Sequence, residues 1–277
     1  MLFNSINTNA QSLIALQSLN LTNAQISVTQ KRVSTGFRVS DARDDGGAFA
    51  VAQAVRSDIA GVIAVNEQLG GVKGVLETTF AALSVVSDTM KQARAVLTRL
   101  ADGAISTEQR NQYKEQYKQL ADQVKKFLED SAYNGRSLLS TDPLKGGGDL
   151  TAIRNDAGGT FTVSAEDGTA LALPTTPPNT AADATGWIVT GGTFDAKDSL
   201  ISTALNKFGA AMSFVQNQIV FNAKKVDAME GGLGALVDAD LAKESSSLEA
   251  LKVRQQLGVQ TLGLANQGPQ VLLGLFR

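Results

Sequence analysis

The sequence from residue 69 to residue 100 reads LGGVKGVLETTFAALSVVSDTMKQARAVLTRL, and this stretch decides the fold class. Its apolar residues recur at alternating steps of three and four, at Leu69, Val72, Leu76, Phe80, Leu83, Val86, Met90, Ala93, Leu97 and Leu100. Such spacing is typical of a helix that packs along one seam. Because the series continues backward to Ala48, it predicts one helix of about 55 residues, or about 80 Å.

Two further segments carry the same kind of seam. Asp102-Gly103 is expected to end the long helix, and Ser106 with Gln109 forms a capping-box pattern for the next one. The second seam comprises Tyr113, Tyr117, Leu120, Val124 and Phe127, and the helix that carries it is expected to end at Asn134-Gly135. The third comprises Ile201, Leu205, Phe208, Met212, Val215, Ile219, Asn222, Val226 and Met229. It is expected to begin after an N-cap at Asp198 and to break at Gly231-Gly232-Leu233-Gly234.

Large side chains from all three segments are predicted to form the packing seam of a helical bundle. They are Leu83, Met90, Leu97, Tyr117, Leu120, Phe208, Val215 and Ile219. Asn222 is the one polar member of the third series, and a single polar residue often sets the register of a coiled coil.

Residues 141–197 differ in composition from the segments on either side. They hold four of the five prolines, and short β-type runs lie between turn signals. The runs are Thr160 to Ser164, Leu171 to Leu173 and Trp187 to Thr190. We expect β-hairpins that lie against the helices, with Trp187 as an anchor, because so little apolar content hardly sustains a separate domain.

Both ends of the chain lack charge. Residues 1–30 contain no charged side chain, and neither do residues 255–276. Amides and hydroxyls can be buried when they are hydrogen-bonded, whereas an unpaired buried ion costs several kcal/mol. The ends are therefore expected to be buried on all sides, although disordered termini remain an alternative and membrane insertion a weaker one.

Heptad series run through both ends. Ile14, Leu21 and Val28 form one series, Leu19, Ile26 and Val33 a second, and Leu241, Leu248 and Leu262 a third. Two uncharged helices at opposite ends of one chain are expected to pair and then to pack against copies of themselves. The predicted inner assembly interface comprises Leu13, Ile14, Leu21, Ile26, Val28, Leu248, Leu251, Leu262 and Leu272.

The composition excludes much enzyme chemistry. The 277 residues include no Cys and no His, and 25 Lys and Arg against 27 Asp and Glu give a net charge of −2. Disulfides, thiolate zinc sites, Ser-His nucleophiles and imidazole catalysis are excluded, and no nucleic-acid partner is expected. The N-terminus does not resemble a Sec signal peptide. No run of about 18 apolar residues is evident, so no membrane contact is expected.

The sequence contains fragments of ligand-binding motifs, but each lacks a residue or a structural context that the motif requires. Asp41, Asp44 and Asp45 invite a calcium interpretation, but an EF-hand loop opened by Asp41 needs a Glu where Ala52 stands. These carboxylates are better explained as caps for the long helix. Because no Gly-rich or nucleophile pattern has the right context either, we predict no cofactor, no metal and no enzyme activity.

The two ends resemble those of bacterial flagellin, the flagellar filament subunit. At the N-terminus the matching residues are Ile6-Asn7-Thr8-Asn9, Ser12-Leu13, Arg32 to Val39, Asp41-Ala42 and Asp44 to Ala48. At the C-terminus they are Val237 to Asp240, Glu244, Gln255 to Leu257, Ala265-Asn266, Pro269-Gln270 and Leu275 to Arg277. The resemblance covers about the first 140 and last 80 residues, and the middle matches nothing in particular.

The resemblance implies a fold and a domain organisation. It implies a mainly α fold, a long antiparallel coiled-coil helical rod built from both chain ends with a small central β-hairpin region. Residues 1–43 and 235–277 would form the terminal inner-tube helices, and residues 44–234 the outer-tube domain, including the variable region 141–197.

The resemblance also implies a function. The chain would self-assemble into an extracellular motility filament after export by the flagellar type III apparatus, without a Sec signal. Expected partners are copies of itself, other flagellins, junction and cap proteins and an export chaperone. Gln92, Val96 and Gln116 stand where immunostimulatory flagellins have Arg, Leu and Glu, which argues against recognition by the innate receptor. A hook–filament junction protein and a secreted coiled-coil effector or translocator are the alternatives.

Overall fold

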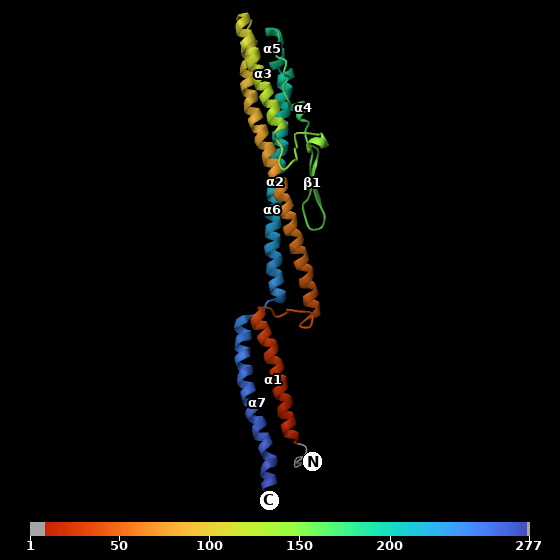
Figure 1. Cartoon of the computed structure of the whole chain (residues 1–277), viewed down its shortest axis with the longest axis vertical. Coiled ribbons are helices and arrows are strands. Elements are labelled where there is room, and N and C mark those ends of the chain that lie inside the picture. The colour runs from red at the N-terminus through yellow and green to blue at the C-terminus, as the bar shows by residue number, and fades with distance from the viewer. Residues whose placement is uncertain (1–8, 276–277) are drawn as a thin grey trace. The chain divides into compact units, whose positions relative to one another are not determined.

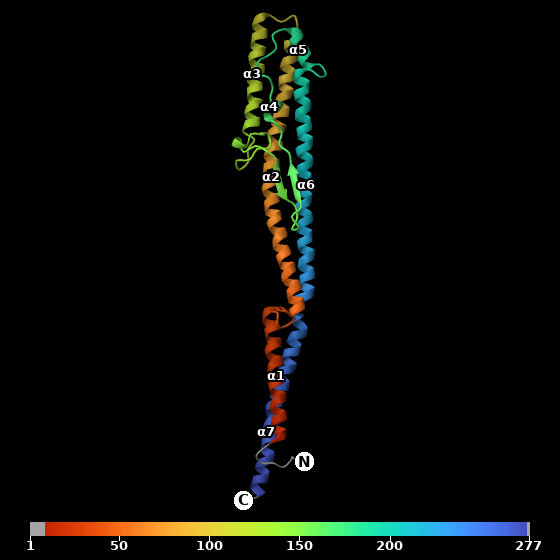
Figure 2. The same ribbon diagram turned by 90° about the vertical axis from the view of Figure 1, so that its right-hand side faces the viewer.

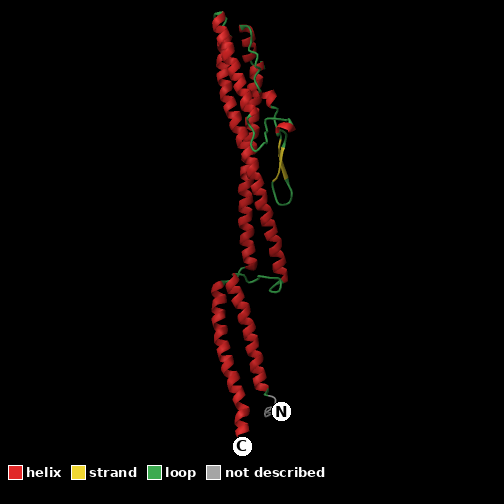
Figure 3. Cartoon of the chain, in the orientation of Figure 1, coloured by secondary structure: helices red, strands yellow, loops and turns green. Residues whose placement is uncertain are grey.

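The structure, a computed structural model, describes the backbone of residues 9–275 and the side chains of residues 9–267. The chain is mainly helical, with one small pair of strands (Figure 3). It divides into two compact units, and each is described by itself. The first contains the residues up to Ser57 and those from Ala228 onward, and the second contains Asp58–Asp227. The predicted boundaries at residues 43/44 and 234/235 stay a prediction.

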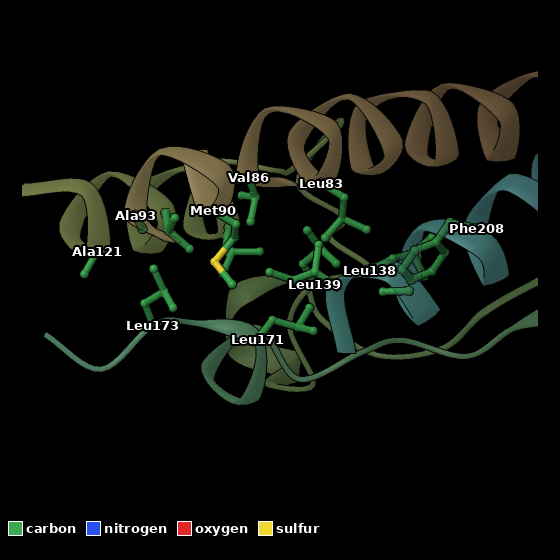
Figure 4. Packing of buried hydrophobic residues seen from close by; sticks show 14 of the residues in the cluster. Leu83, Val86, Met90, Ala93, Ala121, Leu138, Leu139, Leu171, Leu173 and Phe208 are labelled. Atoms are coloured by element: carbon green, nitrogen blue, oxygen red, sulfur yellow. The ribbon is translucent and has the colours of Figure 1, made fainter. Parts of the chain in front are cut away.

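The helix predicted from residues 69–100 is present at its full length. It is α2, Gly46–Leu100, with 55 residues. In the second unit it lies beside α3, Thr107–Glu129, and α6, Thr193–Val237 (Figures 1 and 2). One continuous core joins them, and Figure 4 shows Leu83, Val86 and Met90 of α2 within it, close to Leu139 and Leu171.

The α3 helix starts as predicted but ends differently. The Ser106 hydroxyl accepts a hydrogen bond from the Gln109 N–H, and the Gln109 side chain accepts one from the Ser106 N–H, which confirms the capping box. Phe127 was the wrong seam residue, because its side chain is 37% exposed whereas Leu128 is buried. The helix stops at Glu129, and Asn134-Gly135 instead forms a tight turn between Tyr133 and Arg136.

The α6 helix is longer than predicted at both ends. It begins at Thr193 rather than after Asp198, since the buried Phe194 adds a core contact to its first turn. It also continues through Gly231 to Val237. The three helical glycines, Gly231, Gly232 and Gly234, together cost about 3 kcal/mol relative to alanine, and the buried Val237 with the partly buried Leu233 offsets that loss.

Only one of the three predicted β-type runs is a strand. Strand β1, Leu150–Ile153, pairs antiparallel with β2, Thr160–Val163, with Leu150 opposite Val163. The other two runs were wrongly predicted. Residues 168–171 form α4, Gly168–Leu171, capped by Asp167, and residues 181–188 form α5, Ala181–Ile188, capped by a reciprocal Thr180–Asp183 pair. The caps decide both cases, because they satisfy N–H groups that a strand would pair with a neighbour.

Aromatic contacts anchor this central region within the second unit. Phe161 of β2 stacks on Phe214 of α6 at a centroid distance of 4.4 Å. Trp187 meets the buried Tyr117 edge-on at 5.9 Å, so the predicted role of Trp187 as an anchor is confirmed. A short 3-10 helix, η1, Pro143–Lys145, precedes β1.

The first unit is a helical hairpin of α1, Ala10–Thr35, and α7, Leu241–Leu275. The two helices lie side by side in both views (Figures 1 and 2). Next to the hairpin, the Arg38 N–H and the Val39 N–H both donate to the Val237 carbonyl. Val39, Ala52 and Val237 form the small buried cluster of this unit.

The expectation that no stretch of the chain is long and apolar enough to span a membrane was wrong. Among the described residues, α2 contains an 18-residue stretch that is long and apolar enough to cross a membrane by composition alone. Only 22% of that stretch is buried, and length and composition alone do not establish a membrane span, because core helices and signal sequences share them.

Candidate assembly interface

The α1 helix carries two apolar faces on opposite sides. Its less exposed positions follow steps of three and four and lie on the side toward α7: Ala15, Leu19, Thr22, Ile26, Thr29 and Val33. Leu19 lies against Gly258 of α7, where an added Cβ would come within 3.3 Å of the Leu19 Cδ1 atom. The second predicted heptad series, Leu19, Ile26 and Val33, therefore belongs to the contact within the chain.

The first heptad series has no partner in the described chain. Ile14 is 67% exposed, Leu21 61% and Val28 43%. These residues, with Ala10, Gln17 and Ala24, repeat at steps of four and three on the side of α1 that faces away from α7. We call Ala10, Ile14, Gln17, Leu21, Ala24 and Val28 the outer stripe of α1. Leu13 lies beside it and is also exposed.

The α7 helix repeats this arrangement. Leu248, Leu251 and Leu262 are half-buried on the side toward α1, so in the free chain they serve the hairpin contact. The opposite side carries an exposed outer stripe of Ala250, Val253, Leu257 and Leu264. Sequence reasoning missed this stripe, although the seven-residue spacing of Ala250, Leu257 and Leu264 was a signal for it. Leu272 lies within α7, but its side chain is outside the described residues.

Polar groups fix the register of the hairpin. The Asn9 side-chain amide donates to the Ala265 backbone carbonyl at 2.7 Å, and the Gln255 side-chain amide donates to the Asn23 side-chain oxygen Oδ1 at 2.7 Å. Arg32 pairs with Glu244 at 3.1 Å where the charge-free part of α1 has ended. The buried Thr22 hydroxyl donates to the Ser18 carbonyl within α1. Neutral amides and hydroxyls thus satisfy one another along a contact that holds almost no ions.

The acidic residues after α1 bind a lysine. Lys31 Nζ lies 2.7 Å from Asp41 and 3.0 Å from Asp44, and Asp44 also accepts hydrogen bonds from Ser40. The Lys31 hydrogen bond, with those from Ser40, holds the pKa of Asp44 well below its usual range. Asp45 alone caps α2, through the Ala48 N–H. In the part of the chain that the structure describes, metal-ligating side chains nowhere gather in a group of three or more.

The predicted packing seam lies in the second unit. Its members Leu83, Met90, Leu97, Tyr117, Leu120, Phe208 and Val215 are all buried in one core, and Ile219 packs against that core partly buried. Asn222, 1% exposed, donates to the Asn66 amide oxygen and to the Arg154 carbonyl, and so ties α2 and the end of β1 to α6. Gln92 and Gln116 are exposed, whereas Val96 is buried.

Replacing Tyr117 by phenylalanine is expected to leave the second unit as stable or to stabilise it by about 1 kcal/mol. Among the described residues the buried Tyr117 hydroxyl finds no hydrogen-bond partner, and burial raises the pKa of this phenol. Removing the hydroxyl removes an uncompensated desolvation cost and keeps the ring contact with Trp187. Thermal unfolding of Tyr117→Phe measures the effect, and a clear loss of stability would point to a bonded hydroxyl.

A helical hairpin whose ends carry no charge over residues 10–30 and 255–275, and whose outer sides both expose apolar stripes, is typical of one class of protein, the structural subunit that assembles with further chains. The comparisons with known proteins name the family. The bacterial flagellin N-terminal helical region matches residues 6–142, and the bacterial flagellin C-terminal helical region matches residues 195–276. The segment between them, which includes most of the predicted variable region, lies outside both.

Curated relatives match along the whole chain. The sequence is 34% identical to flagellin FljK of Caulobacter vibrioides over 279 residues, which cover 100% of both chains. It is 34% identical to a flagellin of Brucella melitensis over 289 residues, with 99% of each chain covered. A solved flagellin structure from Bacillus cereus is 19% identical, with a TM-score of 0.37 over 66% of this chain and 94% of that chain. The chain belongs to the bacterial flagellin family, and it is a structural subunit of the flagellar filament.

Proposed function

We propose that the chain polymerises through the outer stripes of α1 and α7, which pack against those of neighbouring copies. The observation that carries this proposal is the exposure of Ile14, Leu21, Leu257 and Leu264 along two helices that lack charges there. Exposed apolar side chains of this kind are unfavourable in water. Covering them with a partner stabilises the assembly by about 25 cal/mol per Å² of apolar area buried.

The two stripes differ in sequence, so a contact between the stripe of one copy and the other stripe of the next need not close into a ring. Such a heterologous contact repeats along a helix and produces a filament. The predicted interface residues then divide by role. Leu13, Ile14, Leu21 and Val28 meet neighbouring copies, while Ile26, Leu248, Leu251 and Leu262 hold the hairpin that presents the stripes.

We further propose that the filament is extracellular, that the chain reaches it through the flagellar type III apparatus, and that it contacts junction and cap proteins there and a chaperone before export. Membership of the flagellin family supports these proposals. We also propose that the chain has no enzymatic activity, and its membership of a structural family supports this. The exposed Gln92 and Gln116, in place of charged residues, support the absence of recognition by the innate receptor.

Hydrogen exchange on seeded filaments tests the proposal. In the free chain the amides of residues 13–28 are expected to exchange fast, since the hairpin buries little apolar surface of its own. In filaments the same amides are expected to exchange at least roughly a hundredfold more slowly. Equal exchange in the free chain and in filaments would refute burial of the stripes. A junction protein would add to filament ends without growing, so electron microscopy of long seeded filaments separates that alternative.

A further inference from the structure

Leu144 has the most exposed large apolar side chain in the described part of the molecule. It is 96% exposed, while the next highest values are 67%. It stands in the middle of η1, Pro143–Lys145, in the second unit. A single exposed leucine is unremarkable on a flexible loop, so the conformation of its turn decides whether it has a role.

The turn that carries Leu144 is held firmly from within. The Asp142 side chain accepts the Leu144 N–H at 3.0 Å, and the Asp142 carbonyl accepts the N–H groups of Lys145 and Gly147. The Ser137 N–H donates to the Gly146 carbonyl at 3.0 Å. Because Leu138 and Leu139 are buried in the core, the whole loop is anchored there.

Glycines allow this loop to close tightly. A Cβ atom on Gly146 would collide with the Gly135 carbonyl oxygen, and one on Gly147 with the Ser140 carbonyl oxygen. Backbone thus packs on backbone beneath Leu144. A side chain presented on a rigid turn loses little entropy on binding, so Leu144 is preorganised for a contact that the free chain does not make.

A hollow of about 690 Å³ opens beside this turn, between the end of α3 and α4. Leu128, Leu139 and Ala172 supply its apolar lining. Its other lining residues include Lys125, Glu129 and Asp167, and the turn itself contributes Asp142 and Lys145. The hollow is larger than one leucine side chain, so it has room for a turn that carries one.

We propose that Leu144 of one copy seats in the hollow of a neighbouring copy. Charge complementarity favours a second copy of this chain as the occupant. An entering turn brings Asp142 on one side of Leu144 and Lys145 on the other. The receiving hollow is lined by two lysines, Lys125 and its own Lys145, which can pair with the entering Asp142. It is also lined by three carboxylates, Glu129, Asp167 and its own Asp142, which can pair with the entering Lys145. This contact rests on the proposed self-assembly and adds a site in the second unit, separate from the stripes of α1 and α7.

Disulfide cross-linking tests the contact cleanly, because the chain has no cysteine of its own. Chains with Leu144→Cys are mixed with isotope-labelled chains carrying Ala172→Cys, grown from seeds and mildly oxidised. A disulfide that joins one chain of each kind is expected in filaments and not in unassembled protein. Replacing Ala172→Cys by Ser199→Cys, an exposed position outside the hollow, is expected to remove it.

Side-chain replacement gives a second measure. Leu144→Asn is expected to raise the critical concentration for growth roughly tenfold, and Leu144→Met to change it less than about twofold. Neither alters folding, since the side chain makes almost no contact in the free chain. Wild-type growth with no cross-link, equal cross-linking in unassembled protein, or an unchanged critical concentration for Leu144→Asn overturns this inference alone. Failure of the wild-type chain to form filaments overturns the proposed function.

Discussion

Replacing Leu21 by aspartate is expected to abolish filament growth while leaving the free chain as stable as before. Leu21 lies at the centre of the outer stripe of α1 and is 61% exposed in the free chain, so an aspartate there remains hydrated. In the proposed filament the same carboxylate would be buried without a partner, which costs several kcal/mol. Because each 1.4 kcal/mol is a factor of ten, the critical concentration would rise beyond roughly a hundredfold.

Seeded growth followed by light scattering measures this effect. Leu21→Met keeps an apolar side chain of similar volume and is expected to grow like the wild type. Leu21→Asn, which is polar but neutral, is expected to grow more weakly than Leu21→Met and better than Leu21→Asp. Normal filaments of Leu21→Asp would show that water reaches this stripe in the assembly, and the proposed interface would then be wrong.

The heptad series illustrate how far sequence alone determines the interface. The pattern identified both Ile14, Leu21, Val28 and Leu19, Ile26, Val33 as apolar series of one helix. It did not tell which series meets α7, because both have the same period and the same lack of charge. Contacts such as Leu19 against Gly258 decide this, and they depend on the register that Asn23 and Gln255 set across 232 positions of sequence.

The helices α2, α3 and α6 were predictable for a different reason. In α2, apolar residues recur at steps of three and four over many turns, and this pattern predicts a helix despite the low helix propensity of its glycines. The capping box at Ser106 predicts the start of α3. The errors arose where local signals conflict with packing. Gly231 was expected to stop α6, although contacts of Leu233 and Val237 extend it. The segment around Trp187 has β-type composition, but the capping pair Thr180 and Asp183 makes it helical.

Replacing Phe208 by alanine is expected to destabilise the second unit by about 3–5 kcal/mol. The Phe208 side chain is fully buried in the core shared by α2, α3 and α6, so its loss removes apolar contacts and leaves a cavity. For a unit of this size each kcal/mol lowers the melting temperature by about 2–4 °C. A fall of roughly 6–20 °C follows, and calorimetry or circular dichroism of the unassembled chain measures it.

Phe221 provides the matched control on the same helix. It is 60% exposed, so Phe221→Ala makes the same chemical change without opening a cavity and is expected to alter stability by less than about 0.5 kcal/mol. Together with Leu21→Asp, these variants separate folding from assembly. Phe208→Ala acts on the melting temperature of the free chain, whereas Leu21→Asp acts on filament growth at an unchanged melting temperature. If Leu21→Asp lowered the melting temperature as much as Phe208→Ala, the outer stripe of α1 would already be covered within the free chain.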